Sequence, residues 1–283
     1  MISLGLIGHP VAHSLSPKLH LFFMQQLGLA GTYTAWDTPT ELLEKQLKSL
    51  WNQGLEGLNI TVPHKASVLA HVTSQSSVVA CVGAANTLLR ADDGWHAENT
   101  DITGFWASLP PATRQAVMGG SVWILGAGGS AKAVVASLCH YHVGHITVIS
   151  RSHDKAQPLI DWITATAKGV STHWHPWGTQ PTAQPPVLII NATSIDLSNG
   201  NDTNDFDWLW QTKDFTHTTA MDLMYRLNRP TTFVASVQHA GCLNALDGLG
   251  MLVHQGADAF TLWTGNPVTA DLRQSAYSHL LPL

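Results

Sequence analysis

The sequence predicts an α/β protein of two domains, and three observations support this prediction. Short apolar runs of strand length alternate with segments of helix length along the chain. The length of 283 residues favours two domains, at about 100–200 residues per domain. Apolar residues make up 45% of the chain, which is enough for a hydrophobic core and excludes a disordered protein.

The first half of the chain alternates strands and helices in a regular order. The expected strands are Ile2–Ile7, Tyr33–Asp37, Gly57–Val62, Thr87–Arg90 and, opposite this last one, Gly94–His96. A helix is expected at Ser16–Leu27, with Pro17 at its first position. A second helix begins at Thr40, a candidate N-cap, and another follows Pro63. The apolar face of the second helix comprises Leu42, Leu43, Leu47 and Leu50.

The second half repeats this alternation after a break. The segment Pro110–Gly120 contains two prolines and two glycines, which predicts an interruption between domains. The strands expected after it are Ser121–Leu125, His145–Ile149, Val187–Ile190 and Ala220–Leu223. A helix is expected after the glycine-rich residues 126–131, ending at about His140, and another at Gly250–Leu262. Loops are expected at Gly178–Pro186 and Asn199–Asp207.

Strands interleaved with helices predict a largely parallel sheet. We expect a first domain at residues 1–103 and a second at residues 104–247. The C-terminal helical segment, residues 248–283, is expected to return to the first domain.

Composition excludes several classes of protein. The chain has 14 basic and 19 acidic residues, a formal net charge of −5, and no basic block, which argues against binding to nucleic acid or to a membrane surface. No apolar stretch approaches the length of a membrane span. Cys81, Cys139 and Cys242 are far apart and form no CxxC pair, which excludes zinc ribbons and thioredoxin chemistry, and no metal site is expected. A reducing compartment, the cytoplasm, is the simplest interpretation, with an unused cysteine pair in an oxidising compartment as the alternative.

A glycine-rich loop joins an expected strand to an expected helix. Its residues are Gly126, Ala127, Gly128, Gly129, Ser130 and Ala131. In dinucleotide-binding folds the first glycine of such a loop allows a tight turn, and the second lets the backbone approach a pyrophosphate. The pattern therefore predicts a dinucleotide site, and a glycine turn that serves packing alone is the alternative.

The residues after the next strand indicate which dinucleotide is bound. Sites for NAD place an acidic residue at this strand end to bind the ribose 2′-hydroxyl, whereas this chain has Arg151, followed by Lys155. A guanidinium attracts a 2′-phosphate and stacks on adenine. We therefore predict NADP(H) as cofactor, with a solvated loop charge at Arg151 as the alternative.

A set of polar residues in the first half is typical of a small-molecule site. Asn59 and Thr61 share one face of a strand, and Pro63 ends that strand before Lys65, which suits proton transfer to a carbonyl or hydroxyl. Taken alone, Lys65 indicates a surface lysine and Asp101 a helix N-cap; the clustering of polar residues around them favours a site. The small hydroxyl and amide side chains suit a polyhydroxylated substrate; they are Ser14, Ser16, Asn59, Thr61, Asn86 and Gln255.

Taken together and in order, these motifs resemble those of the shikimate dehydrogenase family over nearly the whole chain. The matching segments are Gly8–Pro10, His13–Pro17 with His20, Gly57–Lys65, Gly83–Thr87, Asn99–Gly104, Gly126–Ala131, Ser150–Ala156, Asn191–Ser194, Asp222–Tyr225 and Asp247–Leu252 with Gln255. Each segment is modest alone, but their common order is specific.

The resemblance implies NADPH-dependent reduction of 3-dehydroshikimate to shikimate in aromatic amino-acid biosynthesis, by a monomer or homodimer. It implies an N-terminal α/β substrate domain, a Rossmann-type NADP-binding domain and a cleft between them. Lys65 and Asp101 would be the catalytic pair. The substrate would contact both of these and Ser14, Ser16, Asn59, Thr61, Asn86, Tyr225 and Gln255. The cofactor would contact Gly126–Ser130, Ser150, Arg151, Ser152, Lys155, Leu223 and Gly248.

The chain departs from the family pattern at a few positions. Leu21 replaces an asparagine, Asp196 a glycine, Ser150 an asparagine and Lys155 an arginine. Two alternatives on the same fold stay open: a quinate/shikimate dehydrogenase with broader substrate or cofactor use, and a non-catalytic NADP-binding regulator. Lys65 and Asp101 argue against the regulator, and Arg151 argues against NAD use. The ordered motifs argue against an unrelated Rossmann protein.

Overall fold

The chain divides into two compact units, each with its own sheet. In the computed structural model, unit 1 comprises Met1–Gly104 and Leu252–Leu283, and unit 2 comprises Phe105–Met251. The structure describes residues 1–281 except 194, 196–202, 212–213 and 243. Asp196 and Ser194, which the sequence analysis singled out, therefore lie outside the described residues.

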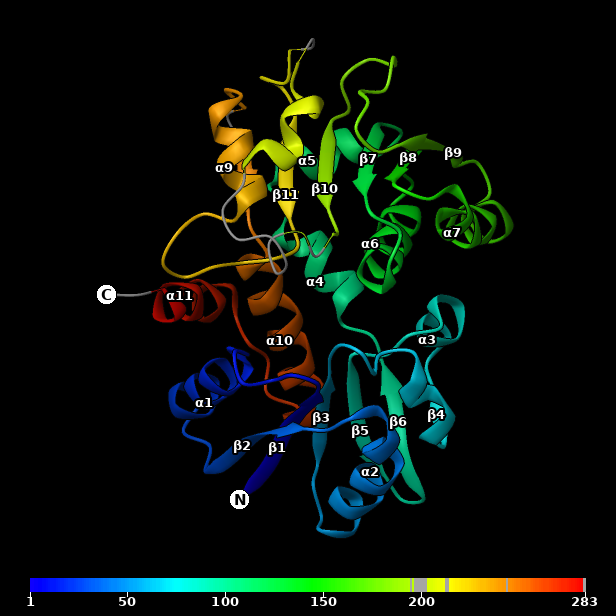
Figure 1. Ribbon diagram of the computed structural model, residues 1–283. Coiled ribbons are helices and arrows are strands. Elements are labelled where there is room, and N and C mark those ends of the chain that lie inside the picture. The colour runs from blue at the N-terminus through cyan, green and yellow to red at the C-terminus, as the bar shows by residue number, and fades with distance from the viewer. Residues whose placement is uncertain (194, 196–202, 212–213, 243, 282–283) are drawn as a thin grey trace. The chain divides into compact units, whose positions relative to one another are not determined.

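Unit 1 is built on a six-stranded sheet of order β2-β1-β3-β5-β6-β4 (Figure 1). Its strands are β1 (Ile2–Gly8), β2 (Gly31–Asp37), β3 (Gly57–Ile60), β4 (Ser74–Gln75), β5 (Thr87–Ala91) and β6 (Gly94–Glu98). β1 pairs in parallel with β2 and β3, whereas β5 runs antiparallel to both β3 and β6. The expected hairpin is therefore present, and it makes this sheet mixed rather than parallel.

The helices of unit 1 cover its sheet with buried apolar side chains. They are α1 (Ser16–Gln26), η1 (Thr40–Leu42), α2 (Leu43–Asn52), η2 (Ser67–His71), α3 (Ser77–Val82), the start of α4 (Asp101–Ser108), most of α10 (Leu249–Thr264) and α11 (Ala270–Leu280). The prediction for α2 was partly wrong, because a 3₁₀ turn precedes it. Leu42 is 47% exposed, and Thr40 makes no side-chain cap. After Pro63 the chain forms the short 3₁₀ helix η2 before α3.

Unit 2 has a six-stranded sheet in which every pairing is parallel, in the order β12-β11-β10-β7-β8-β9. Its strands are β7 (Ser121–Leu125), β8 (His145–Ser150), β9 (Ser171–Pro176), β10 (Leu188–Asn191), β11 (Thr219–Asp222) and β12 (Asn244–Leu246). Numbered from β7, the order read from the β9 edge is 3-2-1-4-5-6, which is the order of Rossmann dinucleotide-binding domains. The sequence analysis missed the two edge strands, β9 and β12.

The described helices that lie wholly within unit 2 are α5 (Pro111–Val117), α6 (Gly129–His140), α7 (His153–Thr166) and α9 (Thr232–His239), with η3 (Thr203–Leu209). Two segments that were expected to be irregular contain helix. Pro111 occupies the first turn of α5, where a missing N–H costs nothing, so the proline pair begins a helix. Part of the loop expected at Asn199–Asp207 belongs to η3. No described helix is both long and apolar enough to cross a membrane.

Candidate active site

The site in unit 1 centres on an ion pair between two side chains 36 residues apart in the chain. Lys65 Nζ lies 2.7 Å from Asp101 Oδ2. The Asp101 side chain is 5% exposed and that of Lys65 is 29% exposed. The carboxylate is therefore nearly removed from water, while the ammonium stays partly accessible to solvent.

Asp101 does more than begin a helix. It is the first residue of α4, and its backbone N–H donates to Asn99 Oδ1 at 3.0 Å. The side chain of Asn99 therefore accepts a hydrogen bond from the first N–H of the helix. Its second carboxylate oxygen, Oδ1, accepts from Asn86 Nδ2 at 2.9 Å. Both oxygens of Asp101 are thus engaged by side chains of the site, and this favours a functional role over a simple cap.

Asn86 connects Asp101 to helix α10. Its Nδ2 lies 2.9 Å from Thr100 Oγ1, 2.9 Å from Asp101 Oδ1 and 3.0 Å from Gln255 Oε1. Its Oδ1 accepts from the backbone N–H of Thr100 at 2.7 Å. Gln255 in turn donates its own Nε2 to Leu252 O at 2.9 Å, which fixes the direction of its amide. The structure therefore brings together four residues predicted from the sequence: Lys65, Asn86, Asp101 and Gln255.

Asn59 is held by two aromatic residues that sequence reasoning did not assign to the site. Its Oδ1 accepts from Tyr33 Oη at 2.7 Å and lies 3.1 Å from His20 Nε2, and its Nδ2 donates to Asn86 O at 3.3 Å. The rings of His20 and Tyr33 stack at 4.5 Å between centroids. Tyr33 and His20 thus fix the orientation of the Asn59 amide. His20 belongs to one of the matching segments, which assigned it no role, and Tyr33 had no signal in the sequence.

Burial gives His20 an unusual pKa and a testable effect on stability. Desolvation lowers the pKa of His20 from 6.5 to about 3, although its bond to Asn59 opposes this shift. Below about pH 6.5 the unfolded chain therefore binds a proton at this position that the folded chain does not. The stabilising effect of neutral His20 is complete above pH 6.5 and is lost as the pH falls toward 3.

We predict that this group lowers the free energy of unfolding by about 1.4 kcal/mol between pH 7.5 and pH 5.5. Urea unfolding of the wild type and of His20→Gln at both pH values measures the effect. The variant should lose less stability on acidification, by about that amount. An identical loss in the two proteins would show that His20 has the same pKa in the folded chain as in the unfolded chain.

The remaining predicted substrate residues lie at the start of α1 and just after β3 and β11. Ser16 N donates to Ser14 Oγ at 3.2 Å, which places both serines together at the start of α1. Thr61 N donates to Ile7 O at 2.9 Å, so Thr61 follows β3 beside the end of β1. Tyr225 belongs to unit 2, three residues after β11 ends, and its role stays a prediction.

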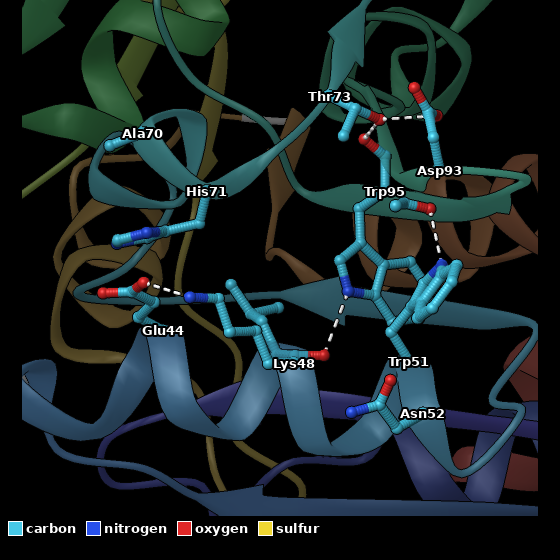
Figure 2. Close-up of a pocket in the computed structure, with 11 residues that line it drawn as sticks. Glu44, Lys48, Trp51, Asn52, Ala70, His71, Thr73, Asp93 and Trp95 are labelled. Atoms are coloured by element: carbon cyan, nitrogen blue, oxygen red, sulfur yellow. Dashed lines mark hydrogen bonds and ion pairs between the residues drawn. The ribbon is translucent and has the colours of Figure 1, made fainter.

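Unit 1 also contains a pocket of about 430 Å³ that none of the predicted site residues lines (Figure 2). Its walls come from α2, η2 and the β5–β6 turn, and their polar groups bond to one another. The indole N–H groups of Trp51 and Trp95 donate to Gly94 O and Leu47 O, and Lys48 pairs with Glu44 at 2.6 Å. We therefore assign this pocket no part in the chemistry.

The glycine loop of unit 2 has the shape that a pyrophosphate needs. Gly126 has φ +100°, a left-handed conformation that favours glycine, and a Cβ there would meet Ala192 O at 3.2 Å. Gly128 caps α6, and a Cβ on Gly128 or Gly129 would meet no atom within 4 Å. The first turn of α6 has no acidic residue and no side-chain cap. Its backbone N–H groups are therefore open to an anion.

The segment after β8 contains two cations, and β8 lies beside β7, the strand that leads into the glycine loop. Arg151 and Lys155 are both exposed, whereas Ser150 is buried at the end of β8. Ser152 caps α7 by accepting from Lys155 N at 3.3 Å. The backbone of Gly126 donates to Ile149 O at 2.8 Å and so links the two segments. The residues present therefore fit a phosphorylated dinucleotide.

Leu223 and Gly248 come together in unit 2, as the resemblance implied. A Cβ on Gly248 would lie 2.2 Å from Leu223 O, so only glycine permits this approach. Asp222 is fully buried just before Leu223 and accepts from Thr231 Oγ1 at 2.6 Å and from Asn191 Nδ2 at 3.1 Å. No role was predicted for Asp222 from the sequence. Its carboxylate joins the end of β11 to the end of β10 through Asn191.

Unit 2 has a parallel sheet in Rossmann order and an open glycine loop, and unit 1 holds a lysine–aspartate pair. Together these features define a dinucleotide-dependent oxidoreductase. Comparison with known proteins identifies the particular family. Residues 6–88 match the shikimate dehydrogenase substrate binding domain, and residues 248–271 match the shikimate 5′-dehydrogenase C-terminal domain. The chain belongs to the shikimate dehydrogenase family.

Full-length relatives agree with this assignment. The chain is 35% identical over 267 residues to shikimate dehydrogenase (NADP(+)) of Xylella fastidiosa (strain Temecula1), covering 94% of this chain and 92% of the relative. It is similar to the crystal structure of shikimate 5-dehydrogenase from Thermus thermophilus in complex with NADP(H) and shikimate, with 32% identity, a TM-score of 0.83, and coverage of 99% and 100%.

A ligand-free 5-ketofructose reductase of a Gluconobacter species also shares the fold, with 27% identity, a TM-score of 0.82 and 99% coverage of both chains. The fold alone therefore does not determine the substrate, and the site residues must. The predicted family, fold class and cofactor are confirmed by these comparisons taken together.

Proposed function

We propose that this chain catalyses the reversible NADPH-dependent reduction of 3-dehydroshikimate to shikimate. The observation that carries the proposal is the Lys65–Asp101 pair, held by Asn86 and Gln255 in a chain of this family. We propose further that the enzyme is cytoplasmic and acts as a monomer or homodimer. Residues 1–103 with 248–283 would serve the substrate, and residues 104–247 the cofactor.

The side chains of the pair divide the proton chemistry between them. When bound, NADPH supplies a hydride to the substrate carbonyl carbon. Negative charge then develops on the carbonyl oxygen, and the Lys65 ammonium donates a proton there, directly or through water. Asp101 orients that ammonium through the 2.7 Å contact. In the reverse direction neutral Lys65 accepts the proton.

The other polar residues of unit 1 would bind and orient the substrate. Ser14, Ser16, Asn59, Thr61, Asn86 and Gln255 offer hydroxyl and amide groups without added charge, which suits a molecule rich in hydroxyls. Tyr225 is a further substrate residue that the resemblance implies. In unit 2 the backbone of Gly126–Ser130 and the side chains of Arg151 and Lys155 would hold the pyrophosphate and the 2′-phosphate.

A spectrophotometric assay of NADP⁺ and NAD⁺ reduction, with shikimate and with quinate, tests this function. Shikimate with NADP⁺ should give the highest kcat/KM. Comparable turnover of quinate would instead identify a quinate/shikimate dehydrogenase. Tight NADP⁺ binding without turnover of either substrate would identify a non-catalytic regulator.

Gly128→Ala tests the cofactor loop separately from the fold. Because Gly128 has φ −82° and open space around its Cβ position, alanine should leave the melting temperature nearly unchanged. The added methyl occupies the space that a pyrophosphate needs, so the Kd for NADP⁺ should rise about tenfold, or about 1.4 kcal/mol. Calorimetric titration and thermal unfolding measure the two quantities. Unchanged NADP⁺ affinity would show that the pyrophosphate binds elsewhere.

A further inference from the structure

A side-chain hydrogen bond ties the loop between β8 and α7 to the neighbouring strand, β9. Trp174 in β9 donates its indole Nε1–H to Ser150 Oγ at 3.1 Å. Trp174 pairs in register with Val148, and Ser150 stands two residues further along β8, on the same face of the sheet. The indole of Trp174 in β9 therefore contacts Ser150, the last residue of the neighbouring strand β8.

The hydroxyl of Ser150 has no capacity left to donate to a ligand. It accepts from Trp174 and donates its one proton to Ser152 O at 2.9 Å. The carbonyl of Ser150 accepts from the backbone N–H of Trp177 at 3.1 Å, and Ser150 is only 8% exposed. Ser150 therefore shapes the loop rather than contacting the cofactor with its hydroxyl.

Arg151 lies between two fixed residues. Ser150 is held by Trp174 and Trp177, and Ser152 is held by Ser150 on its carbonyl and by its cap to α7 on its hydroxyl. The exposed guanidinium of Arg151 thus projects from a backbone that is already ordered. A group that is ordered before binding loses less conformational freedom on binding its ligand.

We propose that Trp174 is a positioning residue for the 2′-phosphate of NADP(H), acting through Ser150 on the backbone of Arg151. The inference rests on the proposed function, because it takes Arg151 to be the phosphate-binding residue. Trp174 supports the one part of the site that distinguishes NADP(H) from NAD(H). Loss of its indole N–H should therefore weaken the binding of NADP⁺ selectively.

The test is calorimetric titration of NADP⁺ and NAD⁺ into the wild type and Trp174→Phe. Phenylalanine keeps an aromatic ring and removes the N–H donor together with part of the indole ring, a loss of volume that the control below shares. A typical single hydrogen bond predicts a roughly 3- to 10-fold rise in the Kd for NADP⁺. The Kd for NAD⁺ should change less than about twofold, and kcat at saturating NADP⁺ should be unchanged.

Trp210→Phe is the matched control, because Trp210 also donates to a serine hydroxyl in unit 2, that of Ser236, at 3.3 Å. This control should bind both dinucleotides as the wild type does. Ser150→Ala removes the same contact from its other side and should give the same selective loss. Adding Trp174→Phe to Ser150→Ala should then change the Kd for NADP⁺ by less than about twofold.

Equal weakening of NADP⁺ and NAD⁺ binding, or no weakening in either Trp174→Phe or Ser150→Ala, would overturn the inference. If the variants behave in this way while the wild type still prefers NADP⁺, the inference about Trp174 fails and the proposed function stands. A wild type that binds NAD⁺ as tightly as NADP⁺ would instead overturn the proposed cofactor preference, and the role of Trp174 with it.

Discussion

Lys65→Ala should lower kcat by about 10²–10⁴ while leaving the Kd for NADPH nearly unchanged. The alanine variant lacks the group that delivers a proton to the oxygen on which negative charge develops. It also leaves the nearly buried Asp101 carboxylate without its cation. Steady-state kinetics in both directions, with NADPH titrated separately, measure the two quantities.

Lys48→Ala is the matched control for Lys65→Ala. Lys48 is an exposed lysine of the same unit, paired with Glu44 on α2. Its loss removes the same charge from unit 1 and should leave kcat within about twofold, since exposed pairs contribute little. A fall in kcat of less than about fivefold in Lys65→Ala would exclude Lys65 as the acid and base of the reaction.

Arg151→Ala should raise KM for NADPH by about 10–150-fold and hardly change KM for NADH. A charge-assisted hydrogen bond to a phosphate contributes roughly 1.5–3 kcal/mol, and each 1.4 kcal/mol is about tenfold. Lys155→Ala should act in the same direction but more weakly, because an ammonium on a flexible stem fits a phosphate less specifically. The preference should shrink as salt rises, since both side chains are exposed.

Lys168→Ala serves as the control here, because Lys168 is an exposed cation of unit 2 just beyond the end of α7. It should leave both KM values near those of the wild type. Equal losses for NADPH and NADH in Arg151→Ala would mean that Arg151 only stacks on adenine. A wild type that prefers NADH would refute the assignment of the cofactor.

The elements that could be predicted from the sequence are those whose residues form an apolar run or periodic pattern of their own. β7 is a run of five residues closed by Gly126, and it has the predicted bounds. β9 was missed because its residues are mostly serine, threonine, histidine and tryptophan, which suit a half-exposed edge strand but form no apolar run. α5 was missed because two prolines indicate a break until the position of Pro111 in the first turn is known.

The same distinction applies to the site. Motif order was enough to single out Lys65, Asp101, Asn86 and Gln255, and the structure brings these four together. No spacing in the sequence relates Tyr33 to Asn59 or Trp174 to Ser150, because each contact joins separate strands. Residues that orient other residues were therefore missed, whereas residues with motif signatures of their own were found.

The contacts of Asn86 have a consequence for the kind of chemical group that the site accepts. Its amide nitrogen carries two hydrogens but faces three oxygens, those of Thr100, Asp101 and Gln255. Asn86 can therefore donate to only two of them at a time, and the hydroxyl of Thr87, 3.3 Å from Thr100 Oγ1, can serve the third. The Asn86 amide nitrogen thus has no hydrogen left for a ligand. A substrate alcohol would meet the oxygens of Asp101 and Gln255 as a donor, whereas a carbonyl would depend on the Lys65 ammonium for its hydrogen bond.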